Sequence, residues 1–398
     1  MTSPLAQITL KPSTSPDQSD DGLLLCPLSQ LLNEHHDSLE SLYERTPNPH
    51  PFLHPDSLRA QFEGMPDIDA IVLQHDGEIR CAAVLDPWSL NVGRIPRTRL
   101  QWRLHGRRVF AKGFLWDGCE DALSRWIHGV AELLREQRRA GLMLEAQAID
   151  TKQWKAIDRS LSAGDSGLKL LRPQGLQPRW RIRLPSSVDQ YWSSQFKGKT
   201  RNTLRRKRKK LGDYRIEVAT RPQDVDGFLA AATEVSQHTW QSIELGLRVK
   251  NSDQEQQLFY SLAERCEFRG HVMWLDDSPV AFVINTSHDG YLHYEETGYL
   301  PQLAHLSPGT VLVSELIDDV INSGEYHTID FGLGHADYKQ LFSNEQTQSA
   351  DTWLLRNSPV NAVAAGMIST QESMKDSAKA ALQKSGVLRR LKKLKRHK

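Results

Sequence analysis

The sequence has no excess of charge of either sign, few cysteines and no long apolar run. Its 50 Lys and Arg residues are balanced by 49 Asp and Glu residues, whereas a dedicated nucleic-acid-binding protein usually carries a clear basic excess. The four cysteines lie far apart and form no Cys-x-x-Cys pair, which argues against a cysteine-ligated zinc site and fits a reducing compartment. No apolar run approaches the roughly 20 residues that span a bilayer, and the polar N-terminus lacks the apolar core of a signal peptide. These absences predict a cytoplasmic protein.

Several catalytic signatures are also missing. The chain contains no Gly-x-Ser-x-Gly, no Walker loop and no dinucleotide-binding glycine fingerprint. Its histidines show no metalloprotease spacing. His50 and His54 lie close together, but four prolines interrupt their segment. We therefore predict no metal site.

What the sequence does contain is one order of elements that occurs twice. In each half a strand, a tight turn and a second strand precede an amphipathic helix and a further strand, in segments 71–85, 122–141 and 142–149, and again in 271–285, 307–324 and 326–332. Gly141 and Gly324 are expected to end the two helices, since glycine closes a helix cheaply in the left-handed conformation. The repetition predicts two related α/β domains in tandem, which suits a chain of 398 residues.

A strongly basic stretch lies between the halves. Nine of the fourteen residues from Lys197 to Lys210 are Lys or Arg. The segment 180–185 before it alternates like an edge strand, and Ser186 or Ser187 can cap a following helix. On that helix the cations occupy most of the surface, and the apolar residues fall close to one face. These apolar residues are Trp192, Phe196, Leu204 and Leu211. The cations are either a solvated face or a surface that meets an anionic ligand.

The segment 291–324 predicts an anion site. A strand is followed by a short loop, and the sequence Ser307-Pro308-Gly309-Thr310 then opens a helix. Backbone N–H groups are unpaired at a helix start and the helix dipole favours anions there. Proline is tolerated in the first turn, and glycine allows a ligand to approach the backbone. Such a strand–loop–helix can hold a pyrophosphate, although a simple helix cap fits the same letters.

Several motifs in this order resemble the GNAT-type acetyltransferase domain of FemAB-like and BioF2-like proteins, which include CelD/BcsL-type acetyltransferases. They are an Arg-x-x-Leu-Arg-Arg core at 201–206, Trp240, Pro-Val-Ala at 279–281, Ser-Pro-Gly at 307–309, and Asp-Phe-Gly-x-Gly followed by Tyr-Lys at 330–339. The match covers roughly residues 186–345, and the first half looks like the family's degenerate upstream copy. The loop His-Leu-Ser-Pro-Gly-Thr departs from the Gln/Arg-x-x-Gly-x-Gly/Ala loop of ordinary GNAT enzymes.

The resemblance implies an α/β fold of tandem GNAT-like domains, with a mixed sheet flanked by helices. It divides the chain into a disordered lead-in at 1–22, a degenerate domain at 23–185, an acetyltransferase domain at 186–356 and a basic helical tail at 357–398. It implies an acyl-CoA-dependent N-acyltransferase that uses acetyl-CoA and no metal. The acceptor would be an amine of a sugar, lipid or cell-envelope precursor, as in exopolysaccharide synthesis. No cofactor is expected in the first half, which lacks a comparable loop.

The candidate site residues follow from the resemblance and from the strand pattern. Neighbouring strand residues point to opposite faces, so one of Glu295 and Glu296 faces the cleft. The candidates for proton transfer are Glu295, Glu296, Asp330 and Tyr338. The expected donor site is Ser307, Pro308, Gly309 and Thr310, and the expected substrate contacts are Arg201, Arg205, Trp240 and Lys339.

Two other functions remain open. One is a Fem-like transferase that takes its acyl group from aminoacyl-tRNA; such a protein is expected to carry a long coiled-coil arm, and no heptad stretch is visible. The other is a binding protein that keeps the tandem fold without catalysis. The basic C-terminal tail is either solvated or attaches to an anionic membrane surface.

Overall fold

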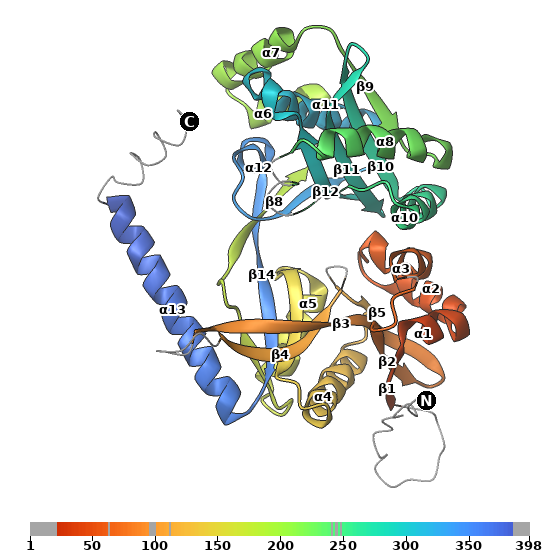
Figure 1. Cartoon of the computed structure of the whole chain (residues 1–398), viewed down its shortest axis with the longest axis vertical. Coiled ribbons are helices and arrows are strands. Elements are labelled where there is room, and N and C mark those ends of the chain that lie inside the picture. Colours follow the sequence, from red (N-terminus) through yellow and green to blue (C-terminus); the bar gives the residue numbers. More distant parts are fainter. Residues whose placement is uncertain are drawn as a thin grey trace.

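The computed structural model describes residues 22–62, 64–94, 101–110, 113–239, 242, 246 and 249–384. Residues 1–21, most of the expected lead-in, and the end of the basic tail lie outside this part of the chain. Two halves lie one above the other, and strand β14 (Glu345–Arg356) runs from one into the other (Figure 1).

The first half runs from β1 to β7. Its elements are β1 (Gly22–Pro27), α1 (Leu28–Glu34), α2 (His36–Arg45), η1 (Pro51–Leu53), α3 (Pro55–Phe62), β2 (Asp69–His75), β3 (Glu78–Arg94), β4 (Gln101–Val109), β5 (Leu115–Trp116), α4 (Glu120–Glu136), β6 (Gly141–Ala148), α5 (Lys152–Ser162) and β7 (Leu168–Leu171). The second half runs from β8 to β14, and the helix α13 (Pro359–Lys384) follows it.

Apart from β5 of the first half and one strand of its own, which lack counterparts among the described residues, the second half has an order of strands and helices similar to that of the first. Its elements are β8 (Gln177–Arg183), α6 (Val188–Gln195), α7 (Gly198–Leu211), β9 (Tyr214–Ala219), η2 (Pro222–Asp224), α8 (Val225–Ser236), α10 (Asp253–Glu264), β10 (Phe268–Leu275), β11 (Ser278–His288), β12 (Tyr291–Tyr299), η3 (Pro301–Leu306), α11 (Pro308–Ser323), β13 (Thr328–Leu333), α12 (Asp337–Phe342) and β14. The predicted mixed sheet flanked by helices is confirmed.

One continuous sheet joins the halves, in the order β1-β2-β3-β4-β6-β14-β8-β13-β12-β11-β10-β9. β14 lies at its centre, where it pairs with β6 and β7 of the first half and with β8 of the second. Most neighbours are antiparallel, but β4 pairs with β6 and β12 with β13 in parallel. Each half therefore contains one parallel pair near its middle.

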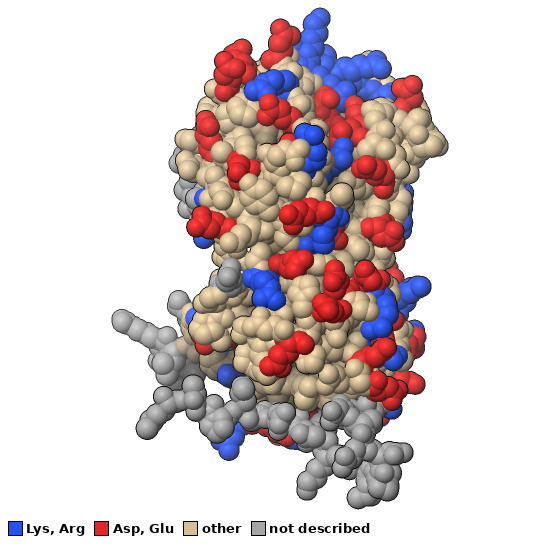
Figure 2. Space-filling view, turned by 90° about the vertical axis from the view of Figure 1, so that its right-hand side faces the viewer, with Lys and Arg blue, Asp and Glu red and all other residues tan. Residues whose placement is uncertain are grey.

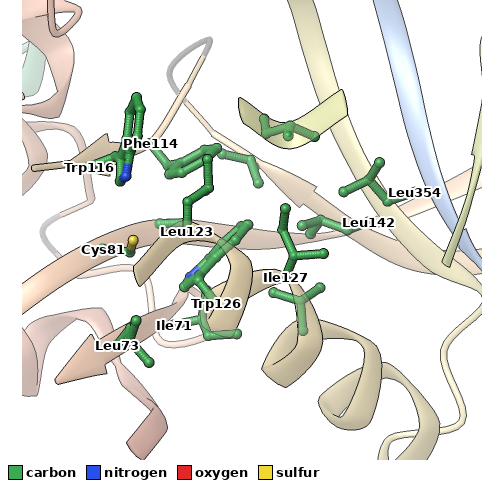
Figure 3. Packing of buried hydrophobic residues seen from close by; sticks show 14 of the residues in the cluster. Ile71, Leu73, Cys81, Phe114, Trp116, Leu123, Trp126, Ile127, Leu142 and Leu354 are labelled. Atoms are coloured by element: carbon green, nitrogen blue, oxygen red, sulfur yellow. The ribbon is translucent and has the colours of Figure 1, made fainter. Parts of the chain in front are cut away.

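The first half packs its core between the sheet and α4. The apolar stripe of α4 is fully buried, and the rings of Phe114 and Trp126 stack with centroids 4.6 Å apart (Figure 3). The predicted turn between β2 and β3 is present, with Asp76 and Gly77 both at positive φ. Glycine is favoured there because it carries no Cβ.

In the second half α11 lies over the sheet as predicted, and Gly324 closes it in the left-handed conformation with φ of 69°. Ser187 caps α6, since its side chain accepts a hydrogen bond from the Gln190 amide. The basic stretch is not one helix with the segment before it. α6 ends at Gln195, and α7 begins at Gly198 because Phe196 takes an extended conformation that turns its ring into the core.

Residues 22–27 form a strand, which pairs with β2 along the sheet edge. Two further local predictions are wrong. The segment 180–185 is not at an edge, since β8 pairs with both β13 and β14. Gly141 does not end α4 but begins β6, where a Cβ would lie 2.6 Å from the carbonyl oxygen of Leu354.

The halves also meet through side chains. Tyr43 on α2 donates to Glu267 across the interface at 2.6 Å, and Arg265 donates to Ser57 at 2.7 Å. The helices α2 and α3 of the first half face α10 and the ends of β10 and β11 (Figure 1). Among the described residues, every helix is too short or too polar to cross a membrane.

Candidate active site

The parallel strands β12 and β13 part soon after they meet. Their ladder consists of three residue pairs and ends at His293 and Asp330, although β12 continues to Tyr299. Beyond that point the strands diverge and leave a gap in the sheet. A gap between parallel strands can admit an extended substrate, and the side chains beside it are therefore candidates for catalysis.

Glu295 is displaced at this gap by a β-bulge. Ile284 on β11 pairs with Glu296 and Asn285 pairs with Tyr294, so Glu295 has no opposite residue. A bulge bends its strand and redirects a side chain. Because of the bulge, simple alternation does not decide where Glu295 and Glu296 point.

The carboxylate of Glu295 points towards the first half. Thr286 donates to its Oε1 at 2.9 Å, and Nε2 of His50 lies 2.8 Å from the same oxygen. Both side chains are almost fully buried, with exposed fractions of 8% for Glu295 and 7% for His50. Thr286 shares a face with Ile284, which packs against α8, whereas α11 packs on the opposite face against Val283. Glu295 and α11 thus lie on opposite faces of the sheet.

Asp330 is held by cations. Its Oδ2 accepts from Nε of Arg179 at 2.7 Å and from Nε of Arg181 at 3.0 Å, and Tyr291 donates to the same oxygen. Its Oδ1 accepts from the Gly332 amide at 2.7 Å. Burial alone would raise the pKa of Asp330, but the two arginine charges outweigh it and hold the pKa well below its usual range. This carboxylate is a poor proton acceptor near neutral pH.

Tyr338 on α12 lies against both strands of the gap. Its ring contacts those of Tyr294 and Phe331 with centroids 5.8 Å apart in each case. Burial raises its pKa, and the charge of Glu296 acts in the same direction. The hydroxyl is therefore protonated and able to donate. Lys339 donates to the Leu333 carbonyl at 3.0 Å, which ties α12 to the end of β13.

The predicted anion site lies at the start of α11. Ser307 adopts the left-handed conformation with φ of 63°, and its side chain does not cap the helix. Gly309 lies against Tyr299, since a Cβ there would be 3.2 Å from the tyrosine ring. The first turn of α11 carries no acidic residue. An anion at this terminus meets the positive end of the helix dipole without a competing carboxylate.

The basic helix α7 lies beside this terminus. Nζ of Lys207 is 3.4 Å from Oγ1 of Thr310, and Nζ of Lys210 donates to the His305 carbonyl at 3.1 Å. Partial burial lowers the pKa of Lys207. Arg201 is half-buried and Arg205 is exposed on the same helix. Lys and Arg side chains gather at the end of the molecule where α7 lies (Figure 2).

A pocket of about 410 Å³ opens between the halves. Tyr43 and His54 of the first half line it together with Glu267 and His288 of the second. Burial would raise the pKa of Glu267, but hydrogen bonds from His288 and Tyr43 lower it overall. Burial lowers the pKa of His54 to about 4. The pocket is therefore lined by a carboxylate and a neutral imidazole.

The structure brings some sequence-predicted residues together and leaves others apart. Glu295 and Asp330 flank the gap on one face, with Tyr338 near Glu296, while Ser307–Thr310 lies at the far end of β12. Trp240 lies outside the described residues. The residues that hold the two carboxylates were not predicted from the sequence, because no local pattern links them to β12 and β13. They are His50, Arg179, Arg181, Thr286 and Tyr291.

Comparisons with known proteins agree with this geometry. A family model described as an acetyltransferase (GNAT) domain matches residues 198–340. The fold is similar to a crystal structure of FemX, with 11% identity over 83% of this chain and 98% of that chain and a TM-score of 0.55. No curated protein sequence matches the chain.

Two further solved structures share the fold. One is the C-terminal domain of a putative lysylphosphatidylglycerol synthetase from Agrobacterium fabrum, with 12% identity over 84% of this chain and 95% of that chain and a TM-score of 0.53. The other is a conserved protein of unknown function from Bacteroides thetaiotaomicron VPI-5482, with 10% identity, coverage of 81% and 97%, and a TM-score of 0.50. Residues 198–340 are therefore similar to a GNAT acetyltransferase domain, and the fold of the two halves together is similar to that of FemX.

Proposed function

We propose that this protein is an acyl-CoA-dependent N-acyltransferase, with acetyl-CoA as its donor. The observation that carries the proposal is the start of α11, where an uncapped terminus without acidic residues lies beside Lys207. A coenzyme A diphosphate fits that combination, because the positive end of the helix dipole and a nearby cation both favour an anion. Arg201 and Arg205 on α7 would contact the remaining phosphate.

Glu295 is the proposed base of the reaction. As the amine nitrogen attacks the thioester carbonyl carbon, a C–N bond forms, the C–S bond breaks and the amine proton passes to Glu295. The thiolate takes a proton from Tyr338, whose raised pKa keeps it protonated until then. Asp330 and its two arginines position the strands instead of moving a proton, and Lys339 fixes α12.

The acceptor is proposed to enter between the halves. Glu295 faces the first half, and the pocket of about 410 Å³ opens along the same interface. The acceptor class remains an amine of a sugar, lipid or cell-envelope precursor, and the basic tail would serve as a peripheral membrane contact. These assignments rest on the resemblance stated above and on the position of Glu295.

Titration calorimetry with acetyl-CoA tests the donor. We expect one site per chain, with binding weakened by salt because the contacts are ionic. A thiol-release assay with glucosamine, ethanolamine and lysine as probe amines then tests transfer. Absence of acetyl-CoA binding, together with salt-sensitive retention of tRNA in a gel shift, would instead support the tRNA-dependent function. Binding of neither would leave the non-catalytic function.

A further inference from the structure

The imidazole of His50 lies 2.8 Å from the Glu295 carboxylate, and it comes from the other half of the molecule. It precedes η1 and is held on several sides. Its Nδ1 accepts from the Phe52 amide at 3.3 Å, and its ring lies 4.9 Å from that of Phe52 and 4.5 Å from that of His293 between centroids. The prolines on either side restrict the backbone of this segment.

The contact with Phe52 determines which ring nitrogen carries the proton. A nitrogen that accepts a hydrogen bond from an amide has no proton of its own. In a neutral His50 the proton is therefore on Nε2, the atom that lies 2.8 Å from Oε1 of Glu295. The imidazole N–H thus lies beside the carboxylate oxygen, outside the angle of a regular hydrogen bond, and Thr286 donates to the same oxygen.

We propose that His50 is a positioning residue for the second half, which holds the Glu295 carboxylate at the gap between β12 and β13. The catalytic site is then composite, because the first half supplies a side chain without which Glu295 is not fixed. The assignment of Glu295 as the base rests on the proposed function, whereas the 2.8 Å contact between the two side chains does not.

A metal ion is the competing explanation for this cluster. The ligand atoms of His50, His293 and Glu295 lie within 4.8 Å of one another, and two imidazoles with a carboxylate can bind a transition metal. Metal-bound histidines, however, usually donate from their second nitrogen. Nδ1 of His50 instead accepts a hydrogen bond from the Phe52 amide, so in the neutral ring Nε2 carries the proton and has no lone pair to offer.

Several charged or titratable side chains surround His50 and Glu295, and the pH dependence of the reaction rate follows from the contact between these two residues. His293 lies against His50, and Tyr291, Asp330, Arg179 and Arg181 follow on the same face of the sheet. A hydrogen bond to the ionised form of a carboxylate favours that form. Removal of His50 therefore raises the pKa of Glu295, and the acidic limb of the pH–rate profile moves to higher pH.

Imidazole ¹⁵N NMR on the full chain tests the hydrogen bond without any substrate. We expect His50 to be the Nε2–H tautomer, and its pKa to fall in Glu295→Gln, because the neutral amide no longer favours the imidazolium. An Nδ1–H tautomer, or an unchanged His50 pKa in Glu295→Gln, overturns the proposal. So does stoichiometric zinc that shifts His50 and His293 together and removes the Nε2 proton.

Kinetics of the same variants test the positioning. We expect His50→Ala to lower kcat by about tenfold to a hundredfold, the value of one hydrogen bond to a charged group, with KM for acetyl-CoA unchanged. His50→Gln places an N–H near the same point and should restore part of the rate and of the pH profile. His36→Gln, at a partly exposed histidine of the first half that does not line the pocket, is the control for damage to the fold. Equal kinetics of His50→Ala and His36→Gln would contradict the role, whereas a wild type inactive with every probe amine contradicts the proposed function alone.

Discussion

Each half contains a helix after its central strands, and the first turn of this helix is acidic in the first half and uncharged in the second. In the first half α4 begins with Glu120 and Asp121, and Glu120 pairs with Arg159 at 2.5 Å. In the second half α11 begins with Pro308 and Gly309, has no acid in its first turn and lies beside Lys207. Carboxylates at a helix start satisfy the dipole and repel a second anion. The halves thus share a backbone arrangement, and the conditions for anion binding differ between them.

The parallel strands differ in the same way. Both ladders contain three residue pairs, but the ladder of the first half ends at Val109 and Leu144, which are buried in the apolar core. The ladder of the second half ends at His293 and Asp330, beside Glu295. A shared fold therefore does not imply a shared function. The two halves differ in the side chains at the end of the parallel ladder, which are polar only in the second half.

The largest expected effect comes from breaking the buried cluster at the second gap. Asp330→Asn leaves Arg179 buried without a counter-charge and Arg181 with Asp150 as its remaining partner, which should lower the free energy of unfolding by about 3–5 kcal/mol. Urea denaturation followed by circular dichroism measures it. Glu120→Gln in the first half, where both members of the Glu120–Arg159 pair are more than half exposed, is the control and should cost about 1 kcal/mol or less. Equal losses would contradict the special role of the second cluster.

The next effect makes α11 resemble α4. Thr310→Glu places a carboxylate in the first turn of α11, and like charges in contact cost several kcal/mol. We expect acetyl-CoA affinity to fall by about a hundredfold, since each tenfold corresponds to about 1.4 kcal/mol. Titration calorimetry measures the change. Thr310→Val, which adds no charge, should bind within about a few-fold of wild type. Unchanged binding in Thr310→Glu would show that the donor site lies elsewhere.

A smaller loss is expected on α7. Lys207→Ala removes the cation next to Thr310 and should weaken acetyl-CoA binding by about tenfold, the value of one charge-assisted contact. It should also reduce the salt dependence of the affinity. Lys209→Ala, on the exposed side of the same helix, is the matched control. If both variants lose affinity equally, α7 attracts the donor only through its overall charge.

The sequence allowed the regular elements to be predicted and left their long-range contacts undetermined. The Asp76-Gly77 turn, the apolar face of α4 and the helix from Pro308 to Gly324 follow from local patterns, because turn residues, periodicity and caps act over a few residues. Gly141 was misplaced because its reason is the close approach of Leu354, which lies far away in the chain.

The candidate site was predictable only in part for the same reason. A bulge at Glu295 depends on how β11 and β12 align, and strict alternation cannot foresee it. The contact between His50 and Glu295 joins two halves, and the prolines that argued against a metal site at His50 say nothing about a carboxylate from β12. The domain limits, the proton-transfer residues and the substrate contacts stay predictions for the experiments above.

The smallest effect concerns acid and the interface between the halves. Because the pKa of His54 is lowered to about 4 in the folded protein, the unfolded chain binds a proton at this residue first as the pH falls. The free energy of unfolding should therefore decrease as the pH falls from about 6.5, the ordinary histidine pKa, to about 4. Below pH 4 the contribution of His54 to this free energy is constant. In His54→Gln the free energy of unfolding should fall by about 1–3 kcal/mol less over this pH range than in the wild type. Thermal unfolding at several pH values measures the difference. His36→Gln, at a partly exposed histidine whose pKa is raised by Asp56, should act in the opposite direction, because a histidine that gains a partner stabilises the fold only below its folded pKa. A parallel response of the two variants would mean that the slope arises from carboxylates and not from the imidazole enclosed between the halves.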